Sequence, residues 1–171
     1  MNRFYTLRRA TVASLLLGLA MSWGGAIAQV SPKDQIVGTW LYVAVDLVRP
    51  DGTRVPLYGP NPQGQANFDG NGRYILMTAR AGQPRFASTD RMQGTAEENK
   101  AVVQGSIAHF GSYTLDDASG TITFHIETST FPNWNGTEQK RPFTIKGDEL
   151  RWRTPASTGD GTAEVVLRRA R

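Results

Sequence analysis

The chain has 171 residues, no cysteine, and 19 Lys and Arg against 15 Asp and Glu, which gives a net charge of +4. The absence of cysteine excludes disulfides, thiol catalysis and zinc–thiolate sites. Three of the arginines lie in the first nine residues. The remainder is nearly neutral, so its charge gives no reason to expect nucleic-acid binding.

The N-terminal segment has the pattern of a cleavable secretory signal. Its arginines precede an apolar run over residues 12–23, which is shorter than the roughly 20 residues of a membrane-spanning helix. Ala26-Ile27-Ala28 is a small-x-small cleavage site. We therefore expect a signal peptide at 1–28, one domain at 29–171, a periplasmic or secreted location and no stable membrane anchor after cleavage. An uncleaved membrane anchor is the alternative.

The rest of the chain consists of short alternating runs separated by turn residues, which is typical of β-strands. Asp69-Gly70-Asn71-Gly72 and Gly147-Asp148 are hairpin signals. Short sequential hairpins favour an all-β fold, a closed antiparallel up-and-down barrel of about eight strands, over a β-sandwich. The expected strands are, in chain order, 37–49, 54–57, 65–68, 73–79, 111–115, 121–129, 139–146, 149–154 and 164–169.

One segment breaks the strand pattern. Thr95 followed by Glu98 is a capping box, and apolar residues recur after it with helical spacing. We expect one short helix at about 96–108 that covers an end or side of the barrel. His109 then lies at the end of this helix, where a cation suits the last carbonyl groups.

Several motifs occur together in an order that resembles a known family. Gly38-Thr39-Trp40 is similar to the G-x-W signature of lipocalin and calycin barrels. With the later motifs it resembles the bacterial lipocalin-like domain family over nearly the whole mature chain. The resemblance implies that Gly38 and Trp40 close one barrel end beneath an arginine of the last strand, Arg168 or Arg169. The later motifs are Tyr58-Gly59-Pro60, Arg85-Phe86-Ala87-Ser88, Phe110-Gly111-x-Tyr113 and Phe131-Pro132-Asn133-Trp134-x-Gly136.

The strand at 121–129 offers the main candidate site. Alternation places His125 and Glu127 on one face and Ile122, Phe124 and Ile126 on the other. If the His125 face points inward, it joins Arg141, Gln139 and Phe143 of the next strand in a ligand-binding group. If the apolar face points inward, His125 and Glu127 face solvent. Periodicity favours the second arrangement and the family resemblance favours the first, so both stay open.

Two aromatic residues lie in loops at a barrel mouth. Trp134 lies between Pro132 and Gly136, and Tyr58 is followed by Gly59 and Pro60. Either residue is a ligand contact at the mouth or a packing anchor for its own loop.

A barrel of this size encloses one small ligand or fills its interior with side chains. We expect an exported protein that binds a small, mostly hydrophobic molecule, with no cofactor and no metal ligand set. One alternative is an isomerase or cyclase of a hydrophobic substrate that uses His125 and Glu127 for acid–base chemistry. Another is a ligand-free interaction module of the cell envelope. The sequence does not indicate an oligomeric state.

Overall fold

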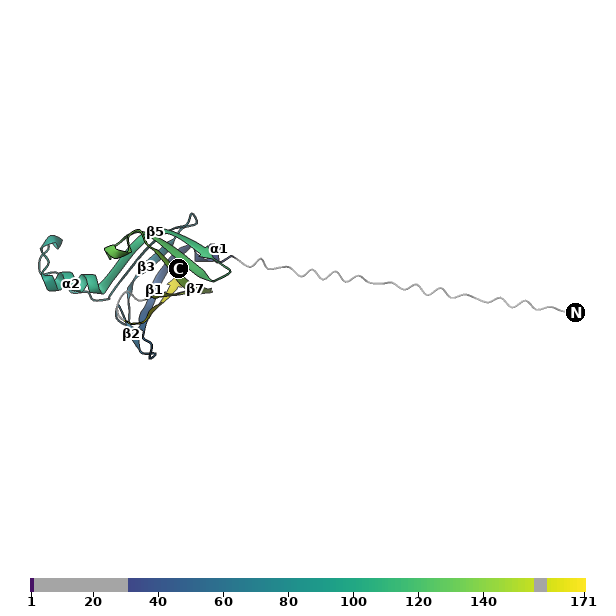
Figure 1. The fold of residues 1–171 in the computed structure, drawn as a ribbon, viewed down its shortest axis with the longest axis horizontal. Helices are drawn as coiled ribbons and strands as arrows, with labels where there is room; N and C mark the ends of the chain where they lie inside the picture. Colours follow the sequence, from purple (N-terminus) through teal and green to yellow (C-terminus); the bar gives the residue numbers. More distant parts are fainter. Residues whose placement is uncertain (2–30, 156–159) are drawn as a thin grey trace.

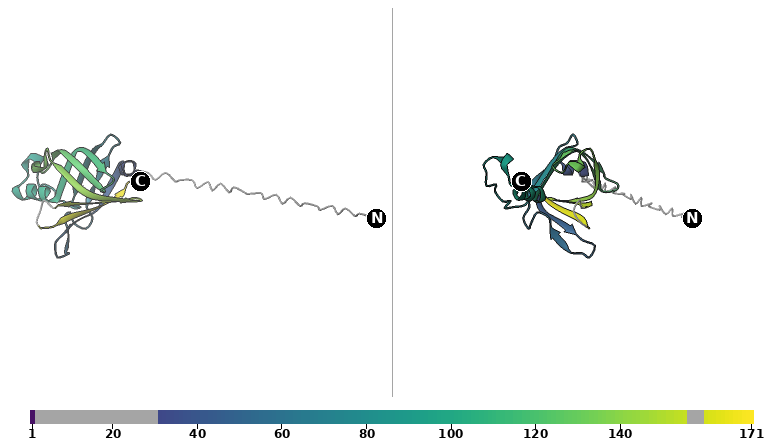
Figure 2. Two further views of the ribbon diagram at one scale, coloured as in Figure 1. Left: turned by 45° about the vertical axis from the view of Figure 1, so that its right-hand side comes forward. Right: turned by 60° about the vertical axis from the view of Figure 1, so that its left-hand side comes forward.

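The computed structural model describes residues 1, 31–155 and 160–171. The expected signal peptide therefore lies outside the described residues. Nine antiparallel strands form one sheet, and pairing of its first and last long strands closes it into a barrel (Figures 1 and 2). The strands are β1 (Gly38–Val48), β2 (Arg54–Pro56), β3 (Gln63–Phe68), β4 (Arg73–Ala79), β5 (Ser106–Asp116), β6 (Thr121–Ser129), β7 (Glu138–Lys146), β8 (Glu149–Pro155) and β9 (Thr162–Arg169).

The expected barrel is confirmed. Eight strands, β1 and β3 to β9, follow one another around the wall in chain order. The short strand β2 pairs with the last three residues of β1, 46–48. Burial alternates along the strands, as in β4 and β9, because every second side chain points into the barrel. Closure pairs each of these eight strands with a neighbour on both sides, although β7 and β8 pair over only part of their length.

A short helix, α1 (Pro32–Ile36), covers one end of the barrel and was not expected from the sequence. Ser31 caps it and Pro32 begins it, which is a favoured arrangement for a helix start. The indole N–H of Trp40 donates to the Ile36 carbonyl at 2.7 Å. This hydrogen bond joins α1 to β1 at the end of the barrel that α1 covers.

The arginine over Trp40 is Arg169, with its guanidinium carbon 4.2 Å from the indole centroid. It also donates to the backbone carbonyls of Val37 and Gln35. The expectation of Arg168 is wrong: this residue is exposed, because neighbouring residues of a strand point to opposite faces.

The second helix, α2 (Ala96–Gly105), has the expected capping box between Thr95 and Glu98. It ends three residues earlier than expected because Ser106 already pairs with Ala79 as the start of β5. It does not cover the barrel: α2 projects beyond the end of β5 (Figures 1 and 2). Two 3-10 turns complete the fold, η1 (Arg91–Gln93) and η2 (Pro132–Trp134).

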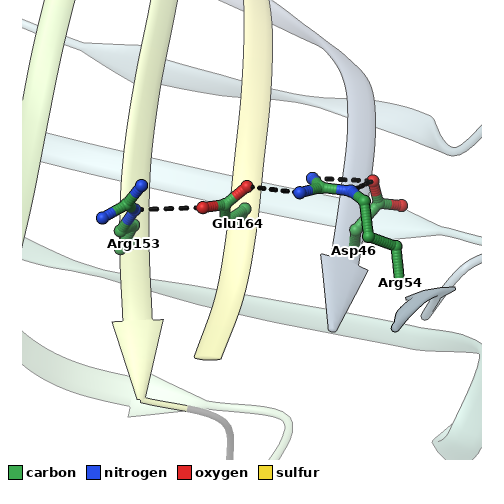
Figure 3. Close-up of polar contacts among 4 residues, drawn as sticks. All are labelled: Asp46, Arg54, Arg153 and Glu164. Atoms are coloured by element: carbon green, nitrogen blue, oxygen red, sulfur yellow. Dashed lines mark hydrogen bonds and ion pairs between the residues drawn. The ribbon is translucent and has the colours of Figure 1, made fainter. Parts of the chain in front are cut away.

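A chain of ion pairs crosses the outer surface where the barrel closes (Figure 3). Glu164 of β9 forms ion pairs with Arg153 of β8 at 3.0 Å and with Arg54 of β2 at 2.8 Å. Arg54 also pairs with Asp46 of β1 at 3.1 Å. These four side chains connect the last two strands with the first two on the outer face.

Candidate functional site

The interior of the barrel is dominated by aromatic rings. Phe68, Tyr74, Phe124 and Trp152 are all almost fully buried. Phe124 lies 4.7 Å from Tyr74 and 5.8 Å from Trp152 between ring centroids, and Phe68 lies within 6.4 Å of all three rings. Their offset and edge-on packing is the arrangement that aromatic rings prefer.

One charged side chain, Arg141 of β7, lies among these rings and is only 4% exposed. Its guanidinium carbon is 4.5 Å from the Phe124 centroid and 5.9 Å from that of Trp152. Nη2 donates to the side-chain oxygen of Gln139 at 2.6 Å. The buried Nε has no hydrogen-bond partner among the described residues.

Burial lowers the pKa of Arg141 to about 10, because a low-dielectric interior disfavours the charged form. The group still carries its proton near neutral pH. Burial also raises the pKa of the Tyr42 and Tyr74 phenols well above their ordinary value, so both remain neutral. The interior therefore holds a positive charge beside neutral phenols.

His109 of β5 lies in the same interior and is 3% exposed. Its Nδ1 is 2.7 Å from the Tyr74 hydroxyl, with which it shares a hydrogen bond. Burial lowers the pKa of His109 to about 3, so the imidazole is neutral. The expected role as a cation at a helix end is wrong, because the helix stops at Gly105 and His109 is a strand residue.

More buried polar atoms in the barrel have no partner within the described part of the chain. They are the Trp152 indole N–H and the hydroxyl oxygens of Thr78 and Thr154. Buried polar groups in proteins are nearly always hydrogen-bonded, so each unpaired group needs an explanation. With Arg141 Nε, these atoms give the aromatic interior unused hydrogen-bonding capacity.

His125 and Glu127 do not belong to this site. His125 lies on the outer face and pairs with Glu138 at 2.8 Å, with its side chain 35% exposed. Glu127 also lies outside, 48% exposed and paired with Arg73. The inward placement of both residues is thus wrong.

The pairing of β6 with β7 gives the physical reason. Arg141 lies opposite Ile122, and His125 lies opposite Glu138. Directly paired residues share a face, so an inward Arg141 requires an inward Ile122 and an outward His125. The acid–base hypothesis built on His125 and Glu127 fails with this geometry.

Of the other expected site residues, Phe143 is buried beside Arg141, and Gln139 is its hydrogen-bond partner. Trp134 packs edge-on against His109 with centroids 5.6 Å apart, so the η2 turn covers the His109 end of the site. Tyr58 packs against the core from its loop near the end of β2.

A model of the lipocalin-like domain matches residues 37–171. The chain belongs to this family. A carrier protein of Aspergillus oryzae, the 4'-hydroxy-3'-methoxypropiophenone carrier protein ppsC, is 34% identical over 77 residues, which cover 42% of this chain and 69% of the relative. A lipocalin-like protein of Bacteroides uniformis has a solved structure that is 15% identical, with a TM-score of 0.44 over 79% of this chain and 98% of the other.

Two of the open cavities in the described part of the lipocalin-like barrel bear on the site. One, of about 420 Å³, lies at the mouth between Tyr58 and Arg80. The other, of about 330 Å³, lies on the wall formed by β7, β8 and β9. Its lining includes Phe143, Trp152 and Val165 of the inner face and Arg151, Arg153 and Glu164 of the outer face. The second shares Trp152 with the ring cluster around Arg141, although Arg141 itself is not among its lining residues.

The sequence reasoning missed His109, Tyr74 and Trp152. A signal for His109 was present, since alternation from Tyr113 through Gly111 places His109 on the same face. Within the described ranges, no group of three potential metal-ligating side chains occurs and no helix is long and apolar enough to span a membrane.

Proposed function

We propose that this lipocalin-like protein carries a small, mostly apolar, ring-bearing molecule inside its barrel, with a polar end at Arg141. The observation that carries the proposal is the unpaired Arg141 Nε within a cluster of aromatic rings. An unsatisfied buried donor costs about 1–3 kcal/mol, more for a charged group, and a ligand oxygen would remove this cost. The rings supply the apolar contact area.

The family supports a carrier role. The Aspergillus oryzae relative is named as the carrier of a hydroxylated, methoxylated aromatic ketone. Such a molecule has one ring and several oxygen acceptors. This combination suits aromatic walls with buried donors. We therefore propose that the ligand of this chain is also a substituted single-ring compound.

The test is native mass spectrometry of the protein purified from its own host under mild conditions. We expect a population with a bound mass of a few hundred daltons, released by organic solvent. Arg141→Met, purified in parallel, is expected to lose most of this population. An unliganded protein in every preparation, with no small molecule in the extract, would contradict the proposal.

We also propose that the protein works outside the cytoplasm after removal of residues 1–28. The support is the charged start, the short apolar run and the Ala26-Ile27-Ala28 site. Intact mass of the protein from the periplasmic or secreted fraction is expected to match a chain that begins at Gln29. A full-length mass in the cytoplasmic fraction would contradict export.

A ligand-free interaction module is the second candidate, and one observation favours it. Leu41, Ile75, Met77 and Phe110 are 40–58% exposed on the outer face of β1, β4 and β5. Ile75 pairs directly with Phe110, and Met77 lies two pairs further along the same ladder. Clustered exposed apolar residues mark interaction surfaces.

Under this second candidate, Ile75→Lys changes the sedimentation behaviour of the native complex, while Arg141→Met does not. Under the carrier proposal, Ile75→Lys keeps the bound small molecule. The two variants together therefore separate the candidates.

A further inference from the structure

The positive charge of Arg141 has no negative partner anywhere in the protein. All 15 Asp and Glu of the sequence lie in the described residues, because residues 2–30 and 156–159 contain none. Arg141 is the one charged side chain that is buried in those residues, and no ion pair includes it. The protein itself thus offers no counter-charge.

Arg169 shows how the same fold satisfies an arginine that serves structure. Its guanidinium also stacks on an indole, that of Trp40, and it donates to two backbone carbonyls. Arg141 has similar ring contacts but a single oxygen partner, Gln139. Cation–π contacts offset only part of the cost of removing a guanidinium from water. The difference between the two arginines indicates an unfilled position beside Arg141.

We propose that the cargo is an anion: a small aromatic molecule whose oxyanion, a carboxylate or ionised phenol, pairs with Arg141. This inference rests on the proposed carrier function and specifies the charge of the ligand. A buried guanidinium binds an oxyanion more strongly than a neutral oxygen, because the hydrogen bonds are charge-assisted and the two desolvated charges neutralise each other. The cargo thereby completes the ion pair that the protein lacks.

The wall beside Arg141 is incomplete, which offers a route for the ligand. Ladder pairing between β7 and β8 begins only at Phe143 and Trp152, although both strands continue beyond this pair. The preceding residue, Pro142, has no N–H to donate. The cavity of about 330 Å³ lies at this point, near the lower limit of about 300 Å³ for ligand pockets, which suits a single-ring compound.

The test compares matched pairs of probes on the mature protein by thermal shift and isothermal titration calorimetry at pH 8. The anions are benzoate, cinnamate and 4-nitrophenolate, and the neutral partners are methyl benzoate, methyl cinnamate and 4-nitroanisole. We expect at least one anion to bind at least tenfold more tightly than its neutral partner. In Arg141→Met this preference disappears, with a loss of about 10- to 100-fold for the anion.

The unliganded variants supply a second readout. Because Arg141 lacks a counter-charge, Arg141→Met is expected to have the same or a higher melting temperature than the native protein. Arg169→Met is the matched control and is expected to melt at a lower temperature, since it loses two hydrogen bonds and a ring contact. An Arg141→Met protein that is unfolded or much less stable would assign Arg141 to the fold and overturn the inference.

The other binding results distinguish failure of the proposed ligand charge from failure of the carrier function. If neutral partners bind as tightly as the anions, or if the anion preference survives in Arg141→Met, the proposed pairing of an anionic ligand with Arg141 is wrong. The carrier function still stands in either case. If no probe binds and the protein from its own host carries no small molecule, both proposals fail.

Discussion

His109 and Arg141 are buried in one interior but differ in how their hydrogen-bonding groups are satisfied. His109 is neutral and shares a hydrogen bond with Tyr74, within a cage of aromatic rings that includes Phe124 and Trp134. Arg141 is charged and retains an unpaired donor. Under the proposed function, His109 serves the stability of the fold and Arg141 binds the ligand.

The neutral state of His109 predicts acid sensitivity. The pKa of His109 is about 3 in the folded protein, against about 6.5 in an unfolded chain. Between these values the unfolded chain binds a proton that the folded protein excludes, so the free energy of unfolding falls as the pH drops from about 6.5. We expect a fall of up to about 1.4 kcal/mol per pH unit from this residue, measured by urea denaturation between pH 7 and pH 4.

His109→Asn removes the titrating group and retains a polar side chain near Tyr74. Its free energy of unfolding is expected to fall less steeply over the same pH range. Identical slopes for both proteins would show that His109 is not the group excluded from protonation.

The contact between β5 and β6 depends on a glycine. The pairing register shifts between Phe110 and Gly111, which leaves Glu127 as an extra residue in β6. This bulge places Ile126 inside while Glu127 and the next residue both face outward. Gly111 lies so close to β6 that a Cβ would be 2.0 Å from the His125 carbonyl oxygen.

Gly111→Ala is therefore expected to destabilise the barrel by at least about 2 kcal/mol, because the backbone of β6 must move to accept a methyl group. Gly70→Ala is the control: no atom lies within 4 Å of its added Cβ, and we expect a change of less than about 0.5 kcal/mol. Chemical denaturation of the two variants measures both values. Equal stability of the two variants would mean that β6 does not approach Gly111 this closely.

The strands themselves could be predicted from local pattern, but the orientation of two of them could not. Glycine turns and alternation gave β4 and β6 with their observed bounds. Alternation defines two faces without stating which is inside, and polar residues on both strands left open whether His125 faces inward together with Arg141. The register of β6 against β7 shows that an inward Arg141 excludes an inward His125, and this register depends on contacts distant in sequence.

At the scale of the whole molecule, closure was predictable because sequential hairpins favour a barrel. The closed end was only partly predictable. Trp40 was identified from its motif, whereas α1 has five residues, too few for a helical period, and is held by contacts with Trp40 and Arg169. Isolated helices of this length are unstable, so tertiary contacts determine α1.

The complete barrel has two chemically different surfaces. Its outer face carries ion pairs such as those of Glu164 with Arg54 and Arg153 (Figure 3). Among the described residues, its interior holds one charged side chain, Arg141, which lies among rings without a partner of opposite sign. An isolated buried charge is energetically costly unless a group of opposite charge neutralises it. In the proposed carrier, the bound ligand supplies that group.

A crystal structure of the protein bound to the tightest aromatic anion tests this account most directly. The account predicts an oxyanion oxygen within hydrogen-bonding distance of Arg141 Nε, with the ring of the ligand packed against Phe124 or Trp152. A ligand bound only in the mouth cleft at Tyr58, with Arg141 Nε still unpaired among the rings, would contradict it.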